Sequence, residues 1–149
     1  MKFTNLILSC ILLAACASTL HTNSTPNETM IQNSIALLDD VLFEEAQAPI
    51  QIDTVLLEGN LLKIQYRTST PKVEMQLVGS TSIAKSFPPI RYCKLIEIGP
   101  KNREAKTLLN FPAELHCDVQ ILTTKRTSGS PTYLQIEGWP EKILYLYSE

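Results

Sequence analysis

The chain has 149 residues, of which 44% are hydrophobic, and a formal net charge of −2. This length is enough for one domain with a buried core and too short for two. No basic surface of the size that phosphate neutralisation demands is visible in the sequence, which argues against nucleic acid as a partner.

The N-terminal segment has the pattern of an export signal. Lys2 is followed by an apolar run from Leu6 to Leu13, and Ala14 and Ala15 precede Cys16. A short charged start, an apolar stretch and small residues before a cut are typical of a secretory signal. The string Leu13-Ala14-Ala15-Cys16, in this position, resembles the lipobox of bacterial lipoproteins. The resemblance extends only to Ser18.

That resemblance implies a sequence of modifications and a location. Residues 1–15 would be removed as the signal peptide, and the sulfur of Cys16 would carry lipid such as palmitate. Cys16 would then be the first mature residue and would hold the domain on a membrane. Ala17 and Ser18 follow, without the Asp that favours inner-membrane retention, so the resemblance points to the outer membrane of a bacterial cell envelope.

The N-terminal segment also fits a plain cleaved signal peptide or a short membrane anchor. A spanning helix needs about 20 apolar residues, however, and this run is shorter. The triplets Asn23-Ser24-Thr25 and Asn27-Glu28-Thr29 match the N-glycosylation pattern and would matter only in a eukaryotic secreted protein.

The next segments are predicted to be a tether and a helix. Residues 16–27 are rich in Ser, Thr and Asn, which suits a flexible tether. Residues 28–48 are predicted to form an amphipathic helix, because Ile31, Ile35, Leu38 and Leu42 recur at helical spacing. Its apolar stripe would pack on the domain's own sheet or, alternatively, dock on a partner protein.

Residues 50–149 change to an alternating pattern that predicts strands. Short segments with alternating apolar and polar residues are separated by Gly, Pro, Ser and Asn. Strands are expected at 50–57, 62–67, 73–77, 91–98, 117–124, 132–137 and 143–147. This pattern predicts an all-β fold, a small antiparallel immunoglobulin-like β-sandwich preceded by the one helix.

Three loops or turns are candidates for partner binding, and the first two are alternatively plain connections between strands. Pro88 and Pro89 cannot lie inside a central strand, so their segment is expected to cross between sheets or run along an edge. A long connection runs from Gly99 to His116, with a short helix expected at 101–109. Trp139 lies in the predicted turn of the C-terminal hairpin, where it would be an exposed anchor, or would pack in the core.

Two cysteines remain for the folded domain if the signal is cleaved and Cys16 is acylated. An even pair in an exported domain favours a disulfide between Cys93 and Cys117. Closing the loop between them would raise the free energy of unfolding by about 3 kcal/mol in the chain-entropy model. A metal site of Cys93, His116, Cys117 and Asp118 is the alternative. Adjacent strand residues point to opposite faces, however, so the sequence predicts no metal.

The sequence contains no catalytic motif, so we expect no catalytic residues, no cofactor and no enzyme activity. His116 is the only domain histidine available as a base, and no nucleophile elbow accompanies it. The predicted function is a lipid-anchored, non-catalytic binding or accessory subunit of a cell-envelope assembly, with an envelope protein as partner. The alternative is a periplasmic inhibitor or immunity-type protein that blocks an enzyme with the loop from Ser86 to Arg91.

Overall fold

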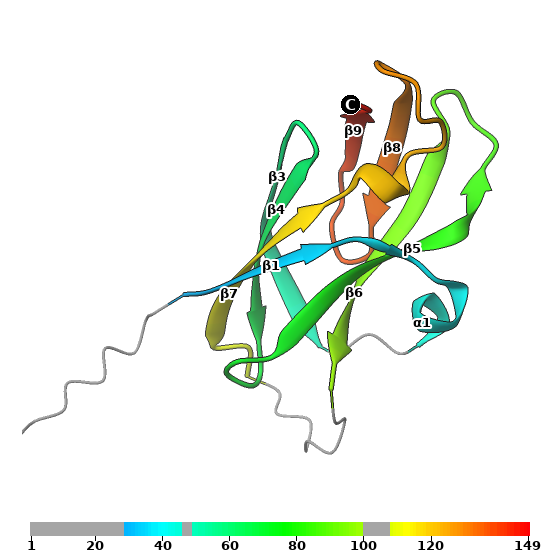
Figure 1. Cartoon of the computed structure of the whole chain (residues 1–149). Coiled ribbons are helices and arrows are strands. Elements are labelled where there is room, and N and C mark those ends of the chain that lie inside the picture. The colour runs from blue at the N-terminus through cyan, green and yellow to red at the C-terminus, as the bar shows by residue number, and fades with distance from the viewer. Residues whose placement is uncertain (1–28, 46–48, 100–107) are drawn as a thin grey trace, which may run out of the picture.

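The structure is a computed structural model that describes residues 29–45, 49–99 and 108–149. Two β-sheets pack face to face with the core between them (Figure 1). The strands are β1 (Met30–Ile35), β2 (Leu37–Leu38), β3 (Ile50–Glu58), β4 (Leu61–Thr68), β5 (Glu74–Ala84), β6 (Ile90–Ile98), β7 (Phe111–Asp118), β8 (Pro131–Ile136) and β9 (Lys142–Leu146), with a short helix α1 (Asp40–Glu44) and a 3-10 turn at Gln120–Leu122. The all-β, two-sheet prediction is confirmed.

The two sheets are mixed rather than purely antiparallel. One has the order β1-β7-β4-β3 and the other β2-β5-β6-β8-β9. The pairs β1–β7, β2–β5 and β6–β8 are parallel, which corrects the antiparallel part of the prediction. Parallel neighbours arise because these strands are joined by long connections rather than by tight hairpins.

The hairpins are the elements that the sequence pattern predicts best. β4 alternates between buried and more exposed residues, with Leu62, Ile64 and Tyr66 in the core. The turn between β3 and β4 has Gly59 at a φ of 58°, a conformation that glycine adopts without strain. Alternation with a period of two buries one face of the strand.

The predicted helix at 28–48 is wrong. Residues 30–38 form β1 and β2, and only Asp40–Glu44 are helical. At Ala36, which is buried, the chain passes from the four-stranded to the five-stranded sheet. These residues therefore belong to the sandwich, whose boundary lies at or before Met30 rather than at residue 50.

The error has a simple geometric origin. Ile31 and Ile35 are four residues apart, a spacing that shares one face in a helix and also in a strand, because four is even. In β1 both side chains face outward and are exposed. The inward side carries Gln32, whose Oε1 accepts hydrogen bonds from the Tyr66 hydroxyl at 3.0 Å and the Met75 N–H at 3.1 Å.

Strand β7 is displaced from its predicted position. The strand expected at 117–124 instead ends at Asp118, and residues 120–122 form the 3-10 turn. β7 begins at Phe111, so Pro112 lies at the start of a strand, where proline is tolerated. Most of the helix expected at 101–109 falls outside the described residues, as do the signal peptide and the tether.

The predicted disulfide is not present in the structure. Cys93 of β6 and Cys117 of β7 are both free and buried, on the inward faces of opposite sheets. Each sulfur has its own polar neighbours: Cys93 lies 3.7 Å from the Arg91 carbonyl, and Cys117 accepts from the Ser34 hydroxyl at 3.5 Å. Burial raises the pKa of Cys93 to about 12 and that of Cys117 to about 11.

Candidate binding surfaces

The loop between β5 and β6 presents an aromatic side chain to solvent. Phe87 lies at its tip and is 97% exposed, while Pro89 behind it is half-buried. Full burial of a phenylalanine side chain is worth about 1.5–3 kcal/mol. This side chain therefore has a large hydrophobic free energy available for a binding event.

The loop is held in place by hydrogen bonds on both sides of Phe87. The Ser86 hydroxyl donates to the Pro88 carbonyl at 2.7 Å, and the Tyr133 N–H of β8 donates to the Pro89 carbonyl at 2.8 Å. The Phe87–Pro88 peptide bond is cis. The loop joins two neighbouring antiparallel strands of one sheet, so the expected crossing between sheets or run along an edge is wrong.

A buried arginine supports the base of this hairpin. Arg91 is 5% exposed, and its guanidinium donates to the carbonyls of Ser80 at 2.7 Å, Thr81 at 2.9 Å and Leu122 at 3.2 Å. Burial lowers the pKa of Arg91. The inhibitor hypothesis used the loop from Ser86 to Arg91. Because Arg91 is buried, a partner could contact only the earlier residues of that loop.

Asp40 fastens α1 to the same region. Its carboxylate accepts from the Ser80 hydroxyl at 3.0 Å, the Thr81 N–H at 2.8 Å and the Thr81 hydroxyl. The hydrogen bond from the Thr81 side chain is the main cause that lowers the pKa of Asp40. Asp39 precedes α1 as its N-cap residue, and its side chain accepts from the Leu42 N–H at 3.0 Å. Hydrogen bonds to Ser80 and Thr81 of β5 therefore connect this strand to both α1 and β6.

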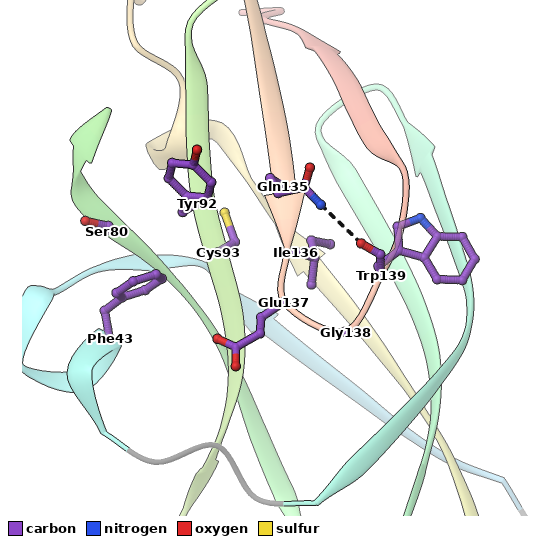
Figure 2. A pocket seen from close by; sticks show the side chains of 9 residues that line it. All are labelled: Phe43, Ser80, Tyr92, Cys93, Gln135, Ile136, Glu137, Gly138 and Trp139. Carbon is purple, nitrogen blue, oxygen red and sulfur yellow. Dashed lines mark hydrogen bonds between the residues drawn. The ribbon is translucent and has the colours of Figure 1, made fainter. Parts of the chain in front are cut away.

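A shallow pocket of about 410 Å³ lies on the outer face of the five-stranded sheet. Figure 2 shows Phe43 of α1 and Tyr92 of β6 beside it, with Gln135 of β8 and Glu137 on the other side. The Gln135 amide donates to the Trp139 carbonyl at 3.1 Å. The Phe43 ring is held by Lys94, whose ammonium lies 4.9 Å from the ring centroid.

Trp139 lies in the β8–β9 turn, as predicted, but its indole is not an exposed anchor. The side chain is half-buried and packs against the core. Figure 2 shows its ring turned away from Phe43 and Tyr92. Trp139 is among the residues that line the pocket, whereas Pro88 and Pro89 are not.

The residues named for metal binding do not converge. His116 faces outward from β7, and its Nε2 lies 2.5 Å from a carboxylate oxygen of Glu114, whereas Cys117 faces the core. The hydrogen bond from His116 lowers the pKa of Glu114. Among residues 29–45, 49–99 and 108–149 no cluster of His, Cys, Asp and Glu has the arrangement of a metal site.

Sequence reasoning missed Phe43, Tyr92 and Phe87 as surface residues. Phe87 was included only as part of a proline-rich loop, and its exposure depends on the hairpin that projects it. Phe43 and Tyr92 are 49 positions apart and belong to different elements. The sequence contained one usable signal, the aromatic residue directly before two prolines.

Comparison with known proteins gives structural likeness without a family. No known protein family and no curated protein matches the sequence. Two solved structures are similar. A NigD-like immunity protein from Bacteroides caccae has a TM-score of 0.48 and 10% identity over 78% of this chain. A DUF1344 protein of unknown function from Bacteroides vulgatus has a TM-score of 0.43 and 14% identity over 81% of this chain.

The chain spans 59% and 57% of the lengths of those two proteins. At these scores and identities the likeness assigns neither a family nor a function to this chain. Within the described residues, no helix has both the length and the apolar character to cross a membrane.

Proposed function

We propose that this protein is a non-catalytic binding domain that contacts a protein partner of the bacterial cell envelope through the β5–β6 loop. The observation that carries the proposal is the 97% exposure of Phe87 on a loop that hydrogen bonds hold in place. A fixed, exposed aromatic side chain loses little conformational entropy on binding and gains its full burial free energy.

Anchoring through a lipidated Cys16 is the second part of this proposal. The start of β1 lies beside the start of β5, since Gln32 contacts Met75, whereas Phe87 follows the other end of β5. Figure 1 shows the start of β1 and the β5–β6 loop at opposite ends of the sandwich. A membrane anchor preceding β1 would therefore attach at the end of the sandwich opposite the β5–β6 loop, which leaves that loop accessible to another protein.

The test is co-purification of the full-length protein from detergent-solubilised envelopes of the source cell. We expect a partner to co-purify with the wild type and to be lost with Phe87→Ser. Ile31→Ser is the matched control, because Ile31 is also an exposed apolar residue but lies in β1 of the other sheet. Retention of the same partner by Phe87→Ser at wild-type level would refute the proposal.

A periplasmic inhibitor or immunity-type role is the second candidate, and the shape of the loop favours it. A single projecting aromatic side chain fits a cleft better than a flat surface. The identity of the co-purified protein separates the two roles. A membrane assembly supports the accessory subunit, and a hydrolase whose turnover the purified protein blocks supports the inhibitor.

A further inference from the structure

Strand β9 forms one edge of the five-stranded sheet. It pairs with β8 on one side, and no other strand in the described part of the chain pairs with its second side (Figure 1). An edge strand presents backbone N–H and C=O groups that are not paired within the sheet. The pairing of β9 with β8 determines which residues of β9 present these groups.

The hydrogen bonds of β8 show which backbone groups of β9 are unpaired within the sheet. The Tyr133 N–H donates to the Pro89 carbonyl at 2.8 Å, so it points toward β6 and away from β9. Tyr133 lies opposite Leu144, and the position opposite Leu146 is Pro131, which has no N–H. In an antiparallel pair such positions direct their backbone groups away from the partner. The N–H and C=O groups of Leu144 and Leu146 therefore point out of the free edge.

The edges that β2 and β3 form are protected in ways that β9 is not. β2 has only two residues. β3 has a register shift at Ile52/Thr54, and Asp53 at that point binds Arg67 at 2.8 Å. Shortness, bulges and charges are the usual devices that prevent edge pairing. β9 contains neither a bulge nor a proline, and Lys142 is its only charged residue.

Apolar side chains accompany the open edge. Leu144 and Leu146 are 47% and 53% exposed on the outer face of the sheet. Tyr133 of β8 lies directly opposite Leu144 on the same face. Residues directly opposite on one face of a sheet contact each other and stabilise the pairing. A strand added to β9 would place its own alternate side chains against this row.

We propose that β9 binds an extended segment of a partner protein as a sixth strand of this sheet. The segment carries apolar residues at alternate positions, which pack beside Leu144 and Leu146, and its backbone pairs with theirs. A second copy of this chain fits less well. Antiparallel pairing with full overlap of two β9 strands sets Leu144 opposite Leu144 and places Lys142 of each copy opposite Leu146 of the other, a charge against an apolar side chain. The register with Leu144 opposite Leu146 sets Glu141 opposite Glu149, two like charges.

Hydrogen exchange of the detergent-purified, full-length protein tests this proposal, with a synthetic peptide of alternating threonine and valine as the probe. Without peptide, we expect the Leu144 and Leu146 amides to exchange rapidly and the Tyr145 amide, which faces β8, to exchange slowly. Saturating peptide should slow exchange at Leu144 and Leu146 by about tenfold or more. The Tyr145 amide reports whether the strand remains folded.

Two variants make the test specific to the edge. Leu144→Pro removes an outward N–H without removing a hydrogen bond to β8, and Leu146→Lys places a charge on the row; both should abolish the slowing. Leu56→Lys is the control, because Leu56 is 50% exposed on β3 of the other sheet.

The proposal is overturned if the peptide leaves the exchange rates of the Leu144 and Leu146 amides unchanged. It is also overturned if these amides become protected in protein alone as its concentration rises, which indicates self-pairing. Phe87→Ser should leave the result intact, so failure here is separate from failure of the loop proposal.

Discussion

Arg91 illustrates how a buried charge is accommodated at the scale of one residue. Three main-chain carbonyls accept from its guanidinium, and these carbonyls come from β5 and from the segment after β7. The side chain therefore connects two parts of the chain that share no strand pairing. A buried donor of this kind is costly to remove, because the carbonyls that it serves lose their partners.

We predict that Arg91→Met lowers the free energy of unfolding by about 3 kcal/mol, since it leaves buried carbonyls without donors. Urea denaturation followed by circular dichroism measures the change. Arg67→Gln is the control: its partner Asp53 lies 2.8 Å away, but the Arg67 side chain is half exposed, so we expect a loss below about 1 kcal/mol. Equal losses in the two variants would contradict this assignment.

Asp40 predicts a pH dependence whose sign follows from its lowered pKa. A carboxyl whose pKa is lower in the folded than in the unfolded state stabilises the fold above its unfolded pKa, and the effect disappears as the pH falls through the folded pKa. Asp40→Asn should therefore be less stable than the wild type near neutral pH. The difference should shrink below the ordinary value of 3.8.

Thermal unfolding of both proteins across this pH range measures the Asp40 effect. Asp53→Asn is a useful comparison, because its carboxylate lies in the other sheet and accepts from Arg67 and Gln51. A difference between wild type and Asp40→Asn that grows as the pH falls would have the wrong sign for the proposed role of Asp40.

Cys93 and Cys117 should behave as buried free thiols. Burial and raised pKa values both suppress the thiolate, which is the reactive form. We predict that iodoacetamide at about pH 8 leaves both residues unlabelled in the folded protein and labels both in concentrated guanidinium chloride. Peptide mapping by mass spectrometry locates the label, with Cys93→Ser as the control that removes one labelled peptide. A disulfide-linked peptide pair would contradict the structure.

At the scale of elements, β1 depends on interactions that its own sequence does not reveal. Gln32 provides the acceptor for Tyr66 of β4 and Met75 of β5, and so connects the two sheets. Burial raises the pKa of Tyr66 to about 12, in keeping with a hydroxyl that donates inside the sandwich. Two polar residues of β1, Gln32 and Ser34, therefore face inward, and both hydrogen bond to other strands.

We predict that Gln32→Leu lowers the free energy of unfolding by about 2 kcal/mol or more, because it removes the acceptor from two buried donors. Asn33→Leu, at the neighbouring exposed position, should change it by less than about 0.5 kcal/mol. Chemical denaturation of both variants gives the comparison. If residues 28–48 formed a helix packed through Ile31 and Ile35, Gln32→Leu would not be expected to destabilise the protein more than Asn33→Leu.

At the scale of the whole molecule, the proposed lipid anchor would hold the protein at a membrane. Intact-mass analysis of protein purified from membranes should show the loss of residues 1–15 and a gain of acyl mass on Cys16. Cys16→Ala should lack the acyl mass and retain the leader, whereas Cys10→Ala should match the wild type. An unacylated native chain that still carries residues 1–15 would refute the anchor.

The hairpins followed from local sequence pattern because each buries one face with a period of two. Leu62, Ile64 and Tyr66 of β4 show this alternation, and Gly59 allows the turn before it. The same local rule gave the alternation of β9, where Tyr145 is buried between the exposed Leu144 and Leu146. Here the sequence determined the strand, the turn and the inward face.

Tertiary structure decided what local pattern leaves ambiguous. A spacing of four residues fits a helix and a strand equally, so only pairing with β7 and the contacts of Gln32 assign residues 30–35 to a sheet. The exposure of Phe87 and the free edge of β9 depend on strand order, which no segment encodes alone. Burial and edge exposure are properties of packing between distant segments, and they are settled only when both sheets have formed.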